Sequence, residues 1–210
     1  MPPPHFTRSA SLSLSFPDKK YGVIYADPPW TFRTWSGKGK DRSPEKHYGC
    51  LSLADIRLLP VADLAEKDCA LFLWVTDPML QEAFKLIDAW GFSYKTVAFT
   101  WAKLNARAPT LMFSEHDFFT GMGYWTRANS ELCLLATKGK PKRQSKSVRR
   151  LVVDRRREHS RKPDSVAERI VDLMGDIPRI ELFARQSRAG WDSWGDEAEK
   201  FNNRRDDAER

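Results

Sequence analysis

The residues best suited to chemistry are an acid, two prolines and a tryptophan in a row, Asp27-Pro28-Pro29-Trp30. They follow directly on the apolar run at residues 21–26, which predicts a buried strand. An acid at the carboxyl end of a strand, followed by a rigid diproline and an aromatic ring, fits one reaction well. That reaction is methyl transfer to the exocyclic amine of a nucleobase.

The amino group of adenine is a poor nucleophile because its lone pair is delocalised into the ring. Two acceptors facing its N–H bonds would localise that pair and aim it at a methyl donor. Asp27 can supply one acceptor as a carboxylate, and the Pro28 carbonyl can supply the other, with its direction preset by the fixed proline φ. Trp30 offers a flat face on which a base can stack. Orientation and electrostatic stabilisation then suffice, without a covalent enzyme intermediate.

The same four residues also fit a strand-ending turn with a buried tryptophan. Consecutive prolines end strands, and aspartate often starts a turn. Short motifs carry a known risk of false positives, so the tetrapeptide by itself leaves both interpretations open.

A second candidate site lies near the C-terminus, and it suits a sulfonium amino-acid nucleoside as methyl donor. Such a donor needs acceptors for its hydroxyl and ammonium groups and a cation for its carboxylate. The candidate acceptors are Glu181, Asp196 and Glu197, and the candidate cations are Lys162 and Arg185. The alternative to a donor site is that Glu181 lies in an ordinary buried strand and that Lys162 lies at an ordinary helix start. No G-x-G-x-x-G or Walker loop is present, which disfavours dinucleotides and nucleoside triphosphates.

The elements that must position these residues alternate along the chain. Short apolar segments predict strands at residues 21–26, 70–75, 95–101, 131–137 and 179–183. Amphipathic segments predict helices at residues 52–59, 78–90 and 164–174. Capping boxes are predicted at Ser52 with Asp55 and at Ser165 with Glu168, and Gly91 and Gly175 as helix ends. This alternation predicts an α/β fold with a sheet covered by helices on both faces.

The length of 210 residues favours one main domain. We expect an N-terminal tail with a possible short strand at residues 1–18, the main domain at residues 19–200, and a polar tail at residues 201–210. The Ser-rich start, which lacks acids, also fits a transit peptide. No apolar run approaches the length of a membrane span, so no membrane partner is expected.

The net charge of +7 favours an anionic partner. Twelve lysines or arginines lie in residues 138–162, opposed by Asp154 and Glu158 alone. Such a block is typical of nucleic-acid contact or of a solvated loop. Three widely spaced cysteines and four histidines show no metal-ligand spacing, so no metal is expected. Cys69 and Cys133 lie in apolar runs and predict reduced core residues, as in a cytoplasmic protein.

Two long segments without clear periodicity, residues 31–48 and 102–123, emerge from the carboxyl ends of predicted strands. Open α/β sheets bind ligands at this edge. The first segment carries basic and aromatic candidates for a nucleic-acid groove, with a solvated loop as the alternative. The candidates in this segment are Arg33, Trp35, Lys38, Lys40, Arg42, Lys46 and Tyr48.

Taken in order, these motifs resemble the MT-A70 family of adenine-N(6) methyltransferases. The resemblance is carried by DPPW, Tyr48-Gly49, LFLWVT at residues 71–76, Gly123-Tyr124-Trp125, ELCLLATKGKP at residues 131–141, Lys162-Pro163, ELFAR at residues 181–185, and the closing W-x-x-W-G-x-E. It covers residues 21–197 and is nearest to short prokaryotic or phage members.

The resemblance implies a Rossmann-like class I methyltransferase fold that is circularly permuted in the β-class order, with a mostly parallel sheet and S-adenosylmethionine as donor. It implies that Asp27, Pro28, Pro29 and Trp30 are the catalytic and base-holding residues. Lys162 would pair the donor carboxylate, and Tyr48 would lie near the target base. The donor would be lined or covered by Asp27, Glu181, Leu182, Phe183, Arg185, Asp196 and Glu197.

We therefore predict an adenine-N(6) methyltransferase that acts on nucleic acid, with DNA preferred to RNA. The alternatives are an RNA methyltransferase and a catalytically inactive nucleic-acid-binding partner subunit. A homo-oligomer is left open, and a cytoplasmic location in a prokaryote or phage host is expected.

Overall fold

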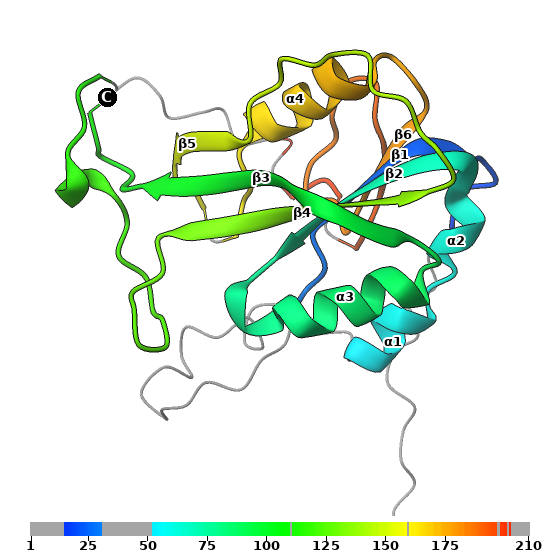
Figure 1. The fold of residues 1–210 in the computed structure, drawn as a ribbon, viewed down its shortest axis with the longest axis horizontal. Helices are drawn as coiled ribbons and strands as arrows, with labels where there is room; N and C mark the ends of the chain where they lie inside the picture. Colours follow the sequence, from blue (N-terminus) through cyan, green and yellow to red (C-terminus); the bar gives the residue numbers. More distant parts are fainter. Residues whose placement is uncertain are drawn as a thin grey trace, which may run out of the picture.

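The fold is built on one mixed β-sheet, seen edge-on across the centre of Figure 1. The structure is a computed structural model, and it describes residues 15–30, 52–109, 111–158, 160–196, 198–200 and 202. The sheet order in this part of the chain is β5-β3-β4-β2-β1-β6-β7. The strands are β1 Tyr21–Ala26, β2 Ala65–Val75, β3 Ser93–Leu104, β4 Ser130–Lys138, β5 Leu151–Arg155, β6 Arg179–Leu182 and β7 Asp192–Trp194. Helices and 3-10 turns connect them: α1 Leu53–Leu58, α2 Val61–Leu64, η3 Asp77–Met79, α3 Leu80–Ala89, η4 Glu115–Asp117 and α4 Asp164–Met174.

Only β4 runs against its neighbours. It pairs antiparallel with both β2 and β3, whereas the pairs β1–β2, β1–β6, β6–β7 and β3–β5 are parallel. These strand pairings confirm the predicted α/β class with a mostly parallel sheet. Because β1 and β6 are parallel neighbours, their carboxyl ends meet at one edge of the sheet.

The five predicted strands are all present, and β1 has the predicted bounds. The sequence missed β5 and β7, which lie at the two outer edges of the sheet. In β5, Val152 is buried while Leu151 is 57% exposed. A three-residue apolar run inside a basic block gave too little pattern to predict this edge strand. The block is therefore more ordered than a solvated loop.

The helices confirm most of the predicted boundaries. Ser52 and Asp55 form the expected capping box at the start of α1. Gly91 follows α3 with φ of 77°, a backbone conformation that suits glycine. The second capping box is wrong: α4 begins at Asp164, so Ser165 lies inside its first turn, and the N-cap is Pro163 without a side-chain hydrogen bond.

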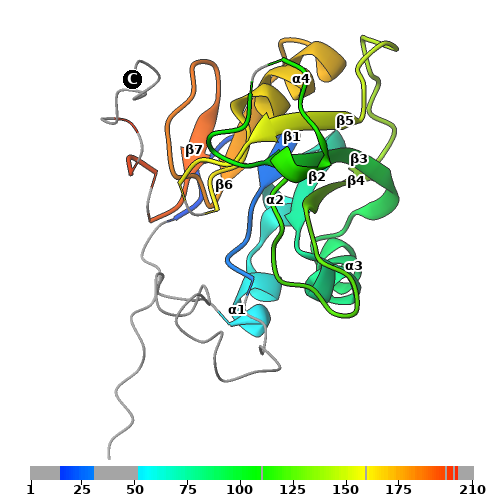
Figure 2. The same cartoon turned by 90° about the vertical axis from the view of Figure 1, so that its left-hand side faces the viewer.

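Helices cover both faces of the sheet, as predicted, with α4 on one side and α1 and α3 on the other (Figures 1 and 2). Each face has its own hydrophobic core. Ile56 of α1 and Ile87 of α3 pack with Leu71 and Leu73 of β2. On the other face, Ile170 of α4 packs in the cluster that contains Phe72 and Trp74 of the same strand, among other residues. Alternating residues of β2 therefore pack into the two cores, because successive side chains of a strand point to opposite faces of the sheet.

Several predictions lie outside the described residues. They include the strand option before residue 15, most of the C-terminal tail, and the segment with Arg33, Trp35, Lys38, Lys40 and Tyr48. Within the described part, none of the helices has the length and apolar character needed to span a membrane. Cys69 and Cys133 are buried free thiols, as expected.

Candidate active site at the carboxyl ends of β1 and β6

Asp27 is the first residue after β1, and it faces the end of β6. The register places Tyr25 opposite Glu181 and Ala26 opposite Leu182. The Asp27 amide donates a long 3.5 Å hydrogen bond to the Leu182 carbonyl, which continues this pairing for one residue. The two motifs singled out in the sequence, which begin 154 residues apart at Asp27 and Glu181, are thus side by side at one edge of the sheet.

Lys162 holds Asp27 in place. Its Nζ lies 2.9 Å from Oδ1 and 2.8 Å from Oδ2 of Asp27, and 3.0 Å from Oε1 of Glu131. A fourth contact joins the same Nζ to the Ser160 carbonyl at 3.4 Å. Burial by itself lowers the pKa of Lys162, but the charges of Asp27 and Glu131 outweigh it and raise that pKa above its ordinary value. The ammonium is thereby held charged beside the acid.

Glu131 extends this contact into a line of alternating charges. Its other oxygen lies 2.7 Å from Nζ of Lys103, so the order is Asp27, Lys162, Glu131, Lys103. Burial of Glu131 raises its pKa, but the two lysines outweigh burial and hold the pKa below its usual range. The line is formally neutral, which makes its burial tolerable. Each lysine also lies over an indole: Lys162 over Trp74 at 5.5 Å, and Lys103 over Trp101 at 4.9 Å.

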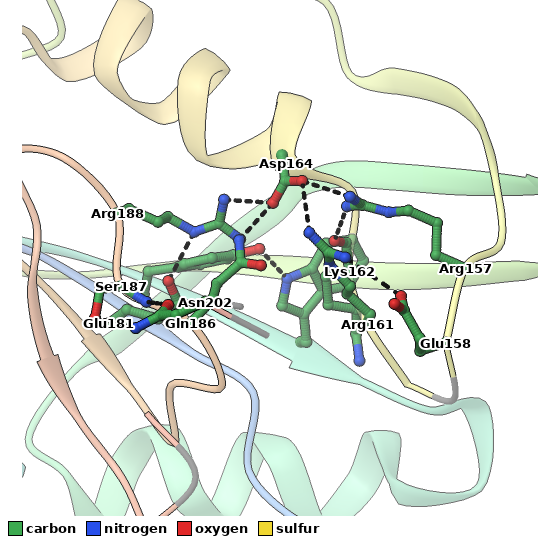
Figure 3. Close-up of polar contacts among 12 residues, drawn as sticks. Arg157, Glu158, Arg161, Lys162, Asp164, Glu181, Gln186, Ser187, Arg188 and Asn202 are labelled. Atoms are coloured by element: carbon green, nitrogen blue, oxygen red, sulfur yellow. Dashed lines mark hydrogen bonds and ion pairs between the residues drawn. The ribbon is translucent and has the colours of Figure 1, made fainter. Parts of the chain in front are cut away.

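A second ionic cluster surrounds Asp164 at the start of α4 (Figure 3). Arg157 donates to Asp164 Oδ2 at 2.6 Å, and Gln186 donates to Oδ1 at 2.6 Å. Arg188 bridges the cluster to the sheet, since it contacts Asp164 with one nitrogen and Glu181 at 2.9 Å with another. Burial raises the pKa of Asp164, but the arginines outweigh it and lower that pKa to about 2.

The same burial argument has the opposite outcome at Glu181. Its pKa is raised, mainly by burial, because Arg188 compensates only in part. A carboxyl group with a raised pKa, close to the carboxyl end of a strand, is a common feature of functional sites.

A small cavity of about 30 Å³ lies between the two ionic clusters. It is lined by Tyr25, Asp27, Ser160, Arg161, Lys162, Glu181, Phe183, Arg185, Gln186 and Arg188. Its volume corresponds to roughly one water molecule. A nucleoside-sized ligand would therefore need side chains such as Arg188 and Gln186 to move aside.

Trp30 was predicted to offer a stacking face for a base. Its side chain is 5% exposed, and its indole N–H donates to the Trp74 carbonyl at 2.8 Å. The ring packs in the core in this structure, and its role in holding a base stays a prediction. The Pro28 carbonyl accepts a 2.8 Å hydrogen bond from the Trp30 amide. One of its two lone pairs remains for another donor.

The predicted donor-site residues near the C-terminus divide into four groups. Glu181, Phe183 and Arg185 line the cavity, with Phe183 at a positive φ of 58° directly after β6. Leu182 is buried in the core, so only its backbone reaches the edge. Asp196 is exposed and does not line the cavity. Glu197 lies outside the described residues, as do the predicted substrate residues Arg33, Trp35, Lys38, Lys40 and Tyr48.

Lys162 was predicted to pair the carboxylate of the donor. In this structure its ammonium contacts Asp27, Glu131 and the Ser160 carbonyl, and the role at a donor stays a prediction. The partner that binds it, Glu131, was not singled out, and neither were Lys103, Asp164 or Arg188. One signal in the sequence could have pointed to Glu131 and Lys103 as site residues. Each is a charged residue near the end of a strand that is otherwise mostly apolar. Among the described residues, no group of three potential ligands is arranged to hold a metal.

An α/β sheet with acids at the ends of two neighbouring parallel strands, and a cavity between them, is the general form of an α/β methyltransferase site. Comparison with known proteins makes this specific: the family model MT-A70 matches residues 21–197, so the chain belongs to the MT-A70 family and is a methyltransferase.

Three relatives illustrate the range of the family. The type II methyltransferase M.MunI of Mycoplasma sp is 35% identical over 85% of this chain and 78% of its own length. The N(6)-adenosine-methyltransferase MT-A70-like protein of Arabidopsis thaliana is 31% identical over 84% of this chain. The N(6)-adenosine-methyltransferase catalytic subunit METTL3 of Homo sapiens is 30% identical over 79%. The chain spans only 24% and 26% of the lengths of these two relatives.

Proposed function

We propose that this protein transfers a methyl group from S-adenosylmethionine to the N(6) amine of adenine in DNA. The observation that carries the proposal is the position of Asp27, at the end of β1, beside Glu181 of β6 on a shared cavity. The first acid is suited to an amine and the second to the hydroxyl groups of a nucleoside donor. Parallel strands bring both to the edge where open α/β sheets bind ligands.

Asp27 is the acceptor for one N–H of the adenine amine. Lys162 donates to both of its oxygens. An ionised carboxylate accepts hydrogen bonds and does not donate them. The side chain keeps 18% of its surface exposed, so it remains open to a substrate. The remaining lone pair of the Pro28 carbonyl is the second acceptor. Together they direct the nitrogen lone pair away from both oxygens.

The residues at the cavity fit the proposed donor. Glu181 offers a carboxylate for ribose hydroxyl groups, and Arg185 offers a cation for a carboxylate. When bound, the donor supplies an electrophilic methyl group on a sulfonium centre. The orienting role of Lys162 on Asp27 replaces the role at the donor carboxylate that the sequence predicted.

The strand order supports a circularly permuted fold. The strand with the acid-diproline motif comes first in the chain, whereas its neighbour β6, which carries the donor-site acid, comes near the end. The match to a type II methyltransferase over most of its length supports DNA as the substrate, and it supports a cytoplasmic location. RNA is the second candidate, favoured by the relatives named N(6)-adenosine-methyltransferases.

The test is a methyl-transfer assay with labelled donor on adenine-rich DNA. Asp27→Ala should abolish transfer and retain part of the donor-induced thermal stabilisation, because the donor is held mainly by β6. Asp27→Asn is the matched control for charge: it keeps one acceptor oxygen and should be severely impaired. Transfer by Asp27→Ala at the wild-type rate would refute the mechanism. Matched DNA and RNA oligonucleotides in competition decide the substrate, and the absence of any stabilisation by the donor would favour an inactive binding subunit.

A further inference from the structure

Between β3 and β4 the chain leaves the sheet and projects beyond it, on the left in Figure 1. The outer part of this segment, residues 121–128, is called here the aromatic turn. It carries Tyr124 at 74% exposure and Trp125 at 93%. A tryptophan with nearly its whole surface in water is uncommon in a folded domain, because burying it would stabilise the protein. Such exposed rings mark binding sites.

Backbone hydrogen bonds and close packing define the conformation of the aromatic turn. The Gly121 amide donates to the Ala128 carbonyl at 2.8 Å, and the Thr126 amide donates to the Tyr124 carbonyl at 3.0 Å. Gly123 has no room for a side chain, since an added Cβ would lie 2.0 Å from the Thr126 carbonyl oxygen. Trp125 itself has φ of 70°, a strained conformation for a bulky residue. The backbone thus presents the indole outward in a fixed direction.

The surroundings of the turn are basic. Arg127 within the turn is exposed. The base of the projecting segment contacts the chain just after β5, where the Arg156 guanidinium lies 4.0 Å from the centre of the Phe119 ring. Arg155, Arg156 and Arg157 follow one another there. Exposed aromatic rings and arginines on one projecting segment are a combination that binds single-stranded nucleic acid, with bases on the rings and phosphates on the cations.

The turn also lies within reach of the candidate active site. Trp125 precedes Glu131 by six residues, and six residues extend over at most about 20 Å. Glu131 contacts Lys162, which contacts Asp27. A nucleic-acid strand rises about 3.4 Å per nucleotide. The chain therefore places Trp125 at most about six nucleotides of such a strand from Glu131.

We infer that Trp125 is a stacking platform for an unpaired base within several nucleotides of the target adenine, so that the protein binds its substrate as a locally single-stranded segment. The inference rests on the proposed function for the identity of the target base. The strained turn holds the ring in its binding position before the substrate arrives, which lowers the ordering cost of binding. Arg127 and Arg156 neutralise the adjoining phosphates.

The test measures binding of a fluorescent adenine-rich single-stranded DNA oligonucleotide by anisotropy, without methyl transfer. Trp125→Ala should weaken the affinity at least fivefold, whereas Trp125→Phe should stay within about twofold of wild type, because a phenyl ring keeps a stacking face. Met112→Ala is the matched control, since Met112 is 97% exposed in the same projecting segment but has no ring. It should bind like wild type. In a series of oligonucleotides with 2-aminopurine at successive positions near the target adenine, the quenching seen at one position with wild type should disappear in Trp125→Ala.

Three outcomes would overturn the inference. The first is equal affinity of Trp125→Ala and wild type, and the second is an equal loss in Met112→Ala. The third is a wild-type dimer, seen by sedimentation, that Trp125→Ala dissociates while DNA binding is unchanged, because the turn would then dock a second copy. Failure of the proposed function is distinct: wild type would bind through Trp125 without transferring methyl groups. Donor-induced thermal stabilisation of Trp125→Ala should equal that of wild type and confirms the folded state.

Discussion

Replacing Lys162 with methionine should turn the line of alternating charges into two facing carboxylates. Nζ lies 2.8 Å from Asp27 and 3.0 Å from Glu131, so the two acids are within about 6 Å of each other. At an effective dielectric constant near 20, two unit charges at this distance repel by about 3 kcal/mol. Methionine fills similar space and suits the neighbouring Trp74 ring, so the electrostatic effect should dominate.

The expected loss of unfolding free energy is about 3–5 kcal/mol, the usual cost of breaking a buried ion pair. In a chain of this length, 3 kcal/mol corresponds to a fall in Tm of about 6–12 °C. The assay is thermal and urea unfolding at pH 7.5. The deficit should shrink as the pH falls through the range in which carboxylates protonate, since protonation removes the repulsion.

The double variant Glu131→Gln/Lys162→Met is the decisive control. It removes the repulsion, and Lys103, with 22% of its side chain exposed, can regain water. Most of the lost stability should return, but methyl transfer should not, because Asp27 still lacks the cation that orients it. A Lys162→Met variant as stable as wild type, or a deficit that the second substitution leaves unchanged, would refute the electrostatic account.

Two further predictions concern stability. Because the folded-state pKa of Asp164 is depressed to about 2 from an unfolded value near 3.9, the stability that this acid contributes is present above pH 4. It should be lost as the pH falls from about 4 to 2; a Tm that is constant over this window would contradict it. Ser52→Ala removes the cap of α1 and should cost about 1 kcal/mol in urea unfolding, whereas Ser52→Thr should cost little. Equal losses in both variants would exclude the capping explanation.

Sequence patterning predicted the central strands because they are apolar on both faces, as in β1 and β2. It failed at the edges, since β5 and β7 bury only one side and are short. At the candidate site, the type and position of Trp30 fit both stacking and burial. Its hydrogen bond to the carbonyl of Trp74, 44 residues away, could not be predicted from local pattern.

The sequence by itself determined the α/β class and the family resemblance, and it singled out Asp27 and Glu181 as candidates, because residue types and local periodicity are written directly in it. Only the tertiary structure decided which charges meet. Lys162 pairs with Asp27 across 135 residues, and Glu131 and Lys103 complete the line from two other strands. Local pattern carries no record of such pairings, because they arise when the sheet brings the ends of β1, β3 and β4 to one place beside α4.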